Sequence, residues 1–361
     1  MTSTRVNEID LLRFVAALAV VLFHYSFRGY AADAMSVMPY PLLAPFSKYG
    51  FLGVQLFFMI SGFVILMTAA SGSLRGFVVS RIVRLYPAFW ACCTITFAVT
   101  VAIGGARYSA SMSRYLVNMT MLNEFLGVGS IDGAYWSLFV EMRFYALVAV
   151  VLFIGKIHQA QMFLILWIIA SVALEILPIS MLRSLLIVDY SAYFIAGATY
   201  FLIWSQGISA ARVGIIIPTW SLALFQTING LPSFEKFYKT NMSGYVVAGL
   251  VTAFFCVMLL VSLRRTGVIG RNRWLLAGVL TYPLYLLHQN IGFMVFNIAY
   301  PTVNPHLLLW STITVVVGLA YAVHIFVERT VSLPMKNAIN HSVRRVQHLR
   351  TRFVERVRAS R

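Results

Sequence analysis

The chain has 361 residues, of which 60% are hydrophobic and 11% are charged, and its formal net charge is +17. A soluble domain carries roughly 25% charged residues, so this composition, with a mean hydropathy of +0.82, excludes a water-soluble globular protein. So basic a chain could bind nucleic acid, but near the C-terminus Arg is interleaved with Val, Leu and Phe, which suits an anionic membrane surface better. We therefore expect a lipid bilayer as partner, and no nucleic acid.

Apolar runs long enough to cross a membrane follow one another along the chain. A spanning helix needs about 20 mostly apolar residues. The sequence predicts such helices over 9–27, 51–70, 85–104, 134–154, 162–179, 184–204, 212–228, 245–263, 274–299 and 307–327. The stretch 115–131 is interrupted by polar residues and is expected to be interfacial or re-entrant. The predicted fold class is therefore all-α, a polytopic membrane protein with about ten spanning helices.

The basic residues of the loops predict the orientation of the chain. Cytoplasmic loops of membrane proteins hold an excess of Lys and Arg. With the N-terminus inside, nineteen Lys and Arg residues fall in cytoplasmic segments and seven in outer loops, and a shift by one helix would remove this difference. Both termini are therefore predicted to be cytoplasmic.

No linker, internal repeat or low-complexity stretch divides the chain. We expect one transmembrane domain over 1–336, followed by a basic amphipathic cytoplasmic tail over 337–361. A helix lying on the membrane surface is the preferred interpretation of the tail, and a partner-binding segment is the alternative. The three cysteines, Cys92, Cys93 and Cys256, lie in apolar runs and match no metal or disulfide pattern, so no metal site is expected.

Ionisable side chains inside a predicted span are costly and therefore mark candidate functional sites. Arg13 and His24 lie on one stripe of the first span, about 16 Å apart along the helix. A snorkelling arginine with an interfacial histidine is the alternative. Arg81 and Arg84 share one helical face at the inner membrane surface. They could bind the phosphates of a cytosolic donor, or they could simply anchor the helix.

The fourth span opens with the densest polar cluster of the chain, which includes Trp136, Ser137, Glu141 and Tyr145. The last three share one helical face. Glu141 is expected at a depth similar to that of the histidine of the first span, where a carboxylate would raise the basicity of the imidazole and fix its tautomer. A structural pair with Arg143 is the alternative, but side chains two residues apart point away from each other on a helix.

Two other spans carry polar or small residues with weaker implications. Tyr285 and His288 lie one turn apart near the middle of the ninth span, where a plain hydrogen bond between helices is the alternative to a functional role. In the second span, Gly53, Ser61 and Gly62 favour close helix packing rather than chemistry.

Six motifs follow one another from about residue 7 to residue 336, and together they resemble the integral-membrane acyltransferase family 3, which O-acylates bacterial surface polysaccharides and related exported molecules. The motifs are Arg13 with His24; Gly53-Val-x-Leu-Phe-Phe-x-x-Ser-Gly-Phe63; Arg81-x-x-Arg84-x-x-Pro87-x-x-Trp90; Trp136-Ser137-Leu-x-x-Glu141-x-x-Phe-Tyr145; Tyr282-x-Leu-Tyr285-Leu-x-His288; and Glu328 near Pro334. This chain departs from the family in two places. Gln55 stands where many members have Asp, and the ending from Glu328 to Pro334 is stretched.

The resemblance implies an acyltransferase of the bacterial plasma membrane. It implies a cytosolic acyl-CoA donor, usually acetyl-CoA, as co-substrate with no bound cofactor, and a hydroxyl of a saccharide or glycolipid as acceptor. His24 and Glu141 would be catalytic, and Arg13, Arg81 and Arg84 would bind the donor. The residues expected to contact the substrates are Trp136, Ser137, Tyr145, Tyr285 and His288.

Two questions stay open at the level of sequence. His24 could deprotonate the acceptor for direct attack or could take the acyl group itself. The alternative function is a secondary transporter or flippase of lipid-linked sugars, which also places charges among about ten helices. Against the transporter, the chain has no internal repeat or pair of broken helices.

Overall fold

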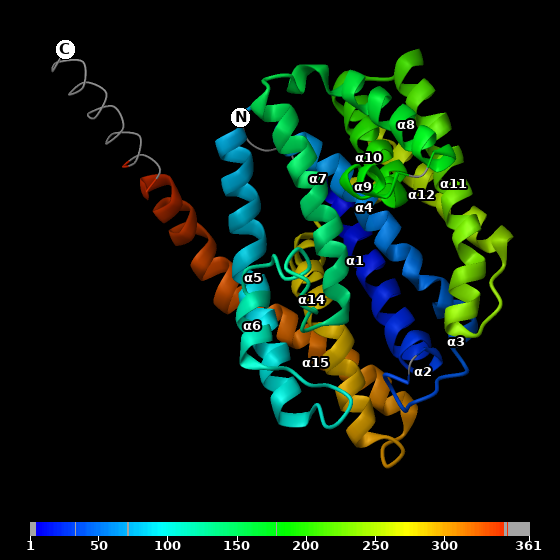
Figure 1. Cartoon of the computed structure of the whole chain (residues 1–361), viewed down its shortest axis with the longest axis vertical. Coiled ribbons are helices and arrows are strands. Elements are labelled where there is room, and N and C mark those ends of the chain that lie inside the picture. The colour runs from blue at the N-terminus through cyan, green and yellow to red at the C-terminus, as the bar shows by residue number, and fades with distance from the viewer. Residues whose placement is uncertain (1–4, 33, 71, 178, 343–344, 346–361) are drawn as a thin grey trace.

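A computed structural model of the chain describes residues 5–32, 34–70, 72–177, 179–342 and 345 (Figure 1). Within these residues the chain forms helices and no strand, and the predicted all-α fold is confirmed. The helices are α1 (Asn7–Phe23), α2 (Gly29–Ala31), α3 (Ala44–Ser47), α4 (Gly53–Ala69), α5 (Leu74–Ile103), α6 (Met112–Asn118), α7 (Trp136–Phe153), α8 (Ala160–Ile176), α9 (Ser180–Leu185), α10 (Val188–Gln206), α11 (Ala210–Tyr238), α12 (Gly244–Ser262), α13 (Val268–Arg271), α14 (Leu275–Ala299) and α15 (Pro305–Val323).

Short segments of tighter or wider helix join several of these elements. The 3₁₀ segments are η2 (Lys48–Leu52), η3 (Gly133–Tyr135) and η4 (Ile157–Gln159), and the π-helical segments are η1 (His24–Arg28) and η5 (His324–Glu328). Single π-helical turns inside longer helices are often found at functional sites.

In the described part of the chain, nine helical segments are long and apolar enough to cross a membrane. The predicted span that is not among these nine is α14, which has 25 residues but carries the polar run of His288, Gln289 and Asn290 in its middle. It packs against α1, α5 and α15, so its polar side chains face protein rather than lipid. Mean hydropathy along a helix is high where the helix contacts lipid. Helix α14 has little contact with lipid, because other helices surround it.

Several helices extend beyond the predicted spans. Helix α5 begins at Leu74 because Ser73 caps it by accepting from the N–H of Gly76, so the arginine pair of this helix lies inside it rather than before it. The last spanning segment runs from Pro305 to Ser342 without a break at residue 336. Most of the predicted tail, residues 343–361 except 345, lies outside the described residues.

The tightest helix pair of the bundle is α4 with α10. A methyl group on Gly62 would overlap the backbone at Phe194, and one on Gly197 would overlap the carbonyl oxygen of Met59. Small residues allow this close approach, as is common between membrane helices. The predicted packing role of Gly62 agrees with this contact.

Loop contacts gather at two ends of the bundle. At one end, Asn7 donates to the carbonyl oxygen of Gly270 at 3.0 Å, and Arg75 donates to that of Asn340 at 3.1 Å. These four residues belong to segments that the sequence analysis places together on the cytoplasmic side.

At the other end, Lys48 donates to the carbonyl oxygen of Asn241 at 2.6 Å, and Tyr108 donates to that of Met35 at 2.7 Å. These loops are the ones expected outside. The loops therefore alternate between two ends as the ten-span arrangement requires, whereas the side of the membrane that each end faces stays a prediction.

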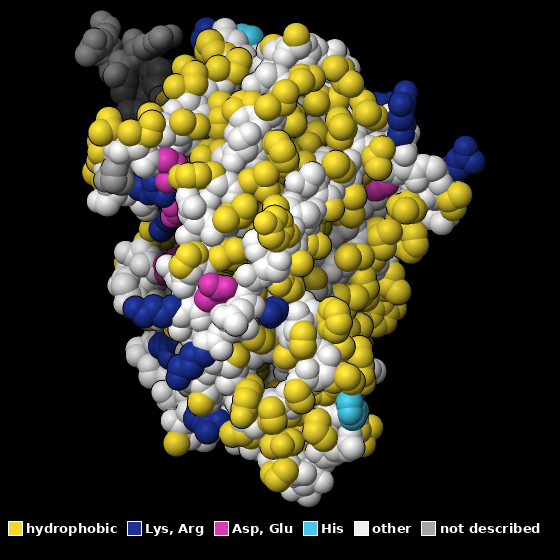
Figure 2. Space-filling view, turned by 90° about the vertical axis from the view of Figure 1, so that its right-hand side faces the viewer, with side chains coloured by type: hydrophobic (Ala, Val, Ile, Leu, Met, Phe, Trp, Pro, Cys, Tyr) yellow, Lys and Arg dark blue, Asp and Glu magenta, His cyan; other side chains and the backbone are white. Residues whose placement is uncertain are grey.

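The face of the molecule on the α11 and α12 side is covered mostly by hydrophobic side chains, and its charged side chains lie mainly along one edge and near the top (Figure 2). Exposed apolar residues of these two helices include Ile217, Phe225, Val246 and Leu260. Such a surface is suited to contact with lipid.

Reporter fusions test the orientation. A reporter placed after Lys239, in the turn between α11 and α12, is expected outside the cell, and one placed after Arg273 is expected in the cytoplasm. Accessibility to an impermeant thiol or protease reagent measures both. If the two fusions report the same side, the alternating arrangement is wrong.

Replacing a contact glycine tests the α4–α10 packing. Gly197→Ala is expected to lower the midpoint of thermal unfolding of the solubilised protein, because overpacking a tight contact costs about 1–3 kcal/mol. Gly249→Ala on α12 is the matched control, since nothing lies within 4 Å of an added methyl group there. Equal midpoints for the two variants would contradict the close contact.

Candidate active site

Four cavities follow one another through the bundle, and neighbouring cavities share lining residues. We name them by their side chains: the Asp10 cavity of about 390 Å³, the arginine cavity of about 250 Å³, the histidine cavity of about 160 Å³ and the glutamine cavity of about 490 Å³. The shared residues are Arg13, Val64 and Arg84 at the first junction, Val54 and Tyr285 at the second, and Phe51, Gln55, Tyr190 and Phe234 at the third. The row runs from the first turn of α1 to the region where α4 and α10 begin.

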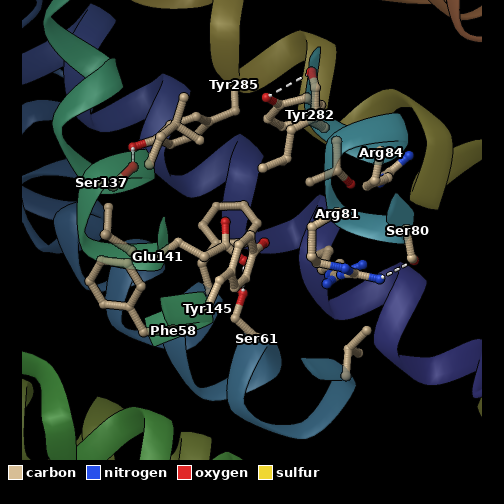
Figure 3. A pocket seen from close by; sticks show the side chains of 17 residues that line it. Phe58, Ser61, Ser80, Arg81, Arg84, Ser137, Glu141, Tyr145, Tyr282 and Tyr285 are labelled. Atoms are coloured by element: carbon tan, nitrogen blue, oxygen red, sulfur yellow. Dashed lines mark hydrogen bonds between the residues drawn. The ribbon is translucent and has the colours of Figure 1, made fainter. Parts of the chain in front are cut away.

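Three arginines line the arginine cavity, as the sequence analysis expects for a donor site. Arg81 and Arg84 come from α5 (Figure 3). Arg13 comes from α1. Arg84 lies 3.5 Å from a carboxylate oxygen of Glu328 and over the ring of Tyr282. Among the residues that the structure describes, Arg84 is the one of the three arginines in an ion pair, so the cavity keeps a cationic lining.

Arg81 and Arg84 have no neighbouring carboxylate of their own on α5, and aromatic rings supply part of their surroundings. The guanidinium of Arg81 donates to the hydroxyl of Ser80 at 3.0 Å and lies 5.9 Å from the ring centre of Tyr145. A cation over an aromatic face is stabilised at about 0.5–2 kcal/mol. This contact orients the guanidinium without neutralising its charge.

Glu141 also lines the arginine cavity, and its partner is Ser61. The serine hydroxyl donates to the carboxylate at 2.5 Å, and Tyr145 lies beside both (Figure 3). Ser61 therefore does more than allow close packing, which is a correction to the sequence analysis. In the described part of the chain, no hydrogen bond or ion pair joins Glu141 to His24, so the expected contact between them is not formed.

The neighbour of His24 is His288 instead. Nδ1 of His24 lies 2.8 Å from the carbonyl oxygen of Val20 and 3.1 Å from Nε2 of His288, and Nδ1 of His288 lies 2.8 Å from the carbonyl oxygen of Tyr285. Because a carbonyl oxygen only accepts, both Nδ1 atoms carry a hydrogen. Nε2 of His24 faces a guanidinium N–H of Arg28, and Nε2 of His288 faces the Nδ1–H of His24. Because both of these neighbours donate, both Nε2 atoms accept and both imidazoles are neutral. The hydrogen bond between helices that was the alternative for His288 is present, and its partner is His24 of η1.

Arg28 completes this group and was missed as a site residue from the sequence. Its guanidinium donates to Nε2 of His24 at 3.2 Å, and both residues line the histidine cavity. The sequence analysis counted Arg28 among the charges of an outer loop. The spacing of four residues between His24 and Arg28 was the available signal, but it requires the helix to continue through η1.

The remaining predicted site residues lie around the junction of the arginine and histidine cavities. The hydroxyls of Ser137 and Tyr285 lie 2.7 Å apart, and Trp136 lines the histidine cavity. Asp132 fixes this region by accepting from the N–H of Ala134 at 2.8 Å and from that of Asn290 at 2.9 Å. The start of α7 is thereby attached to α14 beside His288.

Comparison with known proteins agrees with this architecture. A family model described as an acyltransferase domain matches residues 6–326. The chain is 27% identical over 333 residues to the "Putative membrane-bound transacylase BcsY" of Komagataeibacter xylinus, an alignment that covers 79% of this chain and 72% of that protein. It is 28% identical over 157 residues to the "O-acetyl transferase" of Shigella phage Sf6, which covers 40% of this chain and 45% of that relative. No solved structure matches the chain.

The fold is that of a polytopic helical membrane protein, and its interior holds a row of cavities. The chain belongs to acyltransferase family 3, and it is an acyltransferase. The resemblance found from the six motifs is thus confirmed over nearly the whole chain.

Proposed function

We propose that the protein moves an acyl group, with acetyl as the simplest case, from cytosolic acyl-CoA to a hydroxyl of a saccharide or glycolipid, with His24 as general base. One observation carries this proposal. The histidine cavity shares lining residues with the arginine cavity on one side and with the glutamine cavity on the other. A donor and an acceptor can therefore approach His24 from two different spaces.

The arginine cavity fits the donor. Phosphate groups are bound best by guanidinium groups, which offer charge and paired donors. Arg13, Arg81 and Arg84 surround one cavity, and Arg13 and Arg84 also line the Asp10 cavity at the end where α1 begins. The pantetheine arm would extend from these arginines towards Val54 and Tyr285, where the histidine cavity begins.

The hydrogen-bond pattern of His24 fits a general base. Its Nε2 has a lone pair directed at the cavity, while its Nδ1–H is held by Val20 and His288. In the proposed step, Nε2 takes the proton of the acceptor hydroxyl, whose oxygen forms a bond to the thioester carbonyl carbon. The carbon–sulfur bond then breaks, and the thiolate of CoA receives the proton from His24. Direct transfer needs no covalent intermediate on the protein.

Arg28 has two parts in this scheme. In the resting arrangement it donates to Nε2 of His24, so the acceptor hydroxyl must replace it there. The displaced guanidinium stays in the histidine cavity, where a positive charge would stabilise the oxyanion that develops on the carbonyl oxygen.

The positions of Glu141 and Ser61 favour a donor-side role. Glu141 faces the arginines across one cavity, and Ser61 holds its carboxylate. A carboxylate in this place would position Arg13 by charge attraction rather than act on His24. Membership of the acyltransferase family favours the enzyme over the transporter considered from sequence.

Arg84→Ala tests the donor site. The variant is expected to bind CoA at least tenfold more weakly than the unaltered protein, and Arg84→Lys is expected to fall between them because bidentate phosphate binding is lost. Equilibrium binding of labelled CoA to the purified protein measures this. The matched control is Arg75→Ala, whose side chain contacts Asn340 and lines none of the four cavities. Unchanged CoA affinity in Arg84→Ala would reassign this residue to anchoring.

His24→Ala tests the base. Loss of proton transfer is expected to slow acetyl transfer by about 10²–10⁴-fold. His288→Ala should cause a smaller loss that adds little in the His24→Ala background, because residues acting as a unit are non-additive. Glu141→Gln should instead raise KM for acetyl-CoA in both backgrounds.

Release of CoA from labelled acetyl-CoA, together with label on a neutral trisaccharide (maltotriose, cellotriose or mannotriose), measures the rates. Near-full transfer by His24→Ala would end this mechanism. If the fold-loss in rate of the double variant equals the product of the losses of His24→Ala and His288→Ala, the two imidazoles act independently.

A further inference from the structure

A charged and polar network lies at the glutamine cavity and takes no part in the steps described so far. Arg183 of α9 donates to both carboxylate oxygens of Glu175 at 3.0 and 3.3 Å, and to Asp189 at 2.5 Å. The amide nitrogen of Gln226 on α11 donates to Glu175 at 2.6 Å. Four separate helices, α8 to α11, therefore contribute one connected network to a cavity of about 490 Å³. Small-molecule sites commonly have volumes of about 300–1,000 Å³.

Hydrogen-bonding capacity is left unused in this cavity. The side-chain oxygens of Gln55 and Gln226 are buried and have no hydrogen-bond partner in the described part of the chain. A buried polar atom without a partner costs free energy, of about 1–3 kcal/mol. Gln55 also lines the histidine cavity, so one of the two unused acceptors lies on the path to His24.

Aromatic rings form the apolar part of the lining. Tyr190 lines both the glutamine and the histidine cavities and packs against Trp136 with ring centres 5.7 Å apart. Phe51 and Phe234 likewise line both cavities, with ring centres 4.6 Å apart. Amides, carboxylates and aromatic faces together suit a ligand with many hydroxyls and an apolar C–H face.

The charges of the cavity exclude other ligand classes. The single guanidinium, Arg183, is already held by two carboxylates and is not available to an anion. No group of three or more His, Cys, Asp or Glu side chains able to hold a metal ion occurs among the residues that the structure describes. With Arg28 of the adjoining cavity, the two positive and two negative charges balance. The lining therefore fits a neutral polar ligand.

The charged network of the cavity reaches the surface of the molecule. The side chain of Asp189 is 68% exposed, whereas that of Glu175 in the same network is 19% exposed. The network thus reaches from solvent to the interior, and its inner limit is the junction with the histidine cavity.

We propose that the glutamine cavity is the acceptor site and that it binds a neutral saccharide unit. In this arrangement Gln55 and Gln226 accept hydrogen bonds from sugar hydroxyls, and Tyr190 packs on the face of the ring. The bound sugar presents a neighbouring hydroxyl to His24 through the shared junction. The assignment of this ligand as acceptor rests on the acyl transfer proposed above, but the binding site itself does not.

Direct sugar binding tests the site apart from the chemistry. The probes are maltotriose, cellotriose and mannotriose, titrated without donor into the purified full chain in nanodiscs, with tri-galacturonate as an anionic comparison. At least one neutral probe is expected to bind saturably, and tri-galacturonate at least tenfold more weakly. The double variant Gln55→Leu/Gln226→Leu, which removes both unused acceptors, should weaken neutral binding at least tenfold. Its affinity for CoA should stay unchanged, because neither residue lines the arginine cavity.

Gln161→Leu is the matched control, since Gln161 lies on α8 but lines none of the four cavities. Absence of saturable binding of every neutral probe, equal binding by the double variant, or equal binding of tri-galacturonate would each overturn the proposal. If the unaltered protein binds sugar but transfers no acetyl group, and the double variant loses this binding, the proposed function is wrong and the binding site is supported. If acetyl transfer occurs and the KM for the sugar is unchanged in the double variant, the proposed function is supported and the assignment of the glutamine cavity as acceptor site is wrong.

Discussion

Polar groups in the interior of a membrane protein must find partners within the protein, because lipid offers none. This constraint decides where the helices of this chain lie. The polar run at the middle of α14 can cross the bundle only because α1, α5 and α15 surround it. His288 in that run contacts His24 of η1, and Asn290 in the same run donates its N–H to Asp132. The contacts that satisfy the polar side chains of α14 inside the bundle are thus the same contacts that form the site around His24.

The same constraint fixes the chemistry available at His24. A charged imidazole would need a carboxylate beside it, and the described residues place a second imidazole there instead. Two backbone carbonyl oxygens accept from the Nδ1–H groups, and each Nε2 faces a donor and therefore accepts. The donor to Nε2 of His24 is a guanidinium, which a hydroxyl can replace at the cost of one hydrogen bond. The pair is therefore arranged to receive a proton rather than to carry one at rest.

Much of the fold could be predicted from the sequence because the hydropathy of a segment indicates whether it contacts lipid. The ends of the helices could not be predicted in this way, since they depend on capping residues and on contacts within the protein. Ser73 starts α5 eleven residues before the apolar run begins, and the last spanning segment continues to Ser342. The residue types of the site were also recognisable, because Arg13, Glu141 and His288 are unusual inside spans. The contacts between these residues were not predictable, because the depth of a residue along a helix does not determine the direction in which its side chain points. Glu141 contacts Ser61, and His288 contacts His24.

The residues that sequence reasoning missed lie near helix ends, where charged residues are ordinary. Arg28 and Arg183 are two of the seven Lys and Arg residues that the sequence analysis counts in outer loops. The structure places each of them on a cavity. This location has a physical consequence. The arginine cavity holds cationic groups, whereas Arg183 is neutralised by its carboxylates, so the arginine and glutamine cavities differ in charge. A phosphate-bearing molecule gains little by moving past Val54 and Tyr285, and a neutral one gains little by entering the arginine cavity. Charge alone would then keep two substrates in separate spaces whose shared boundary lies beside His24.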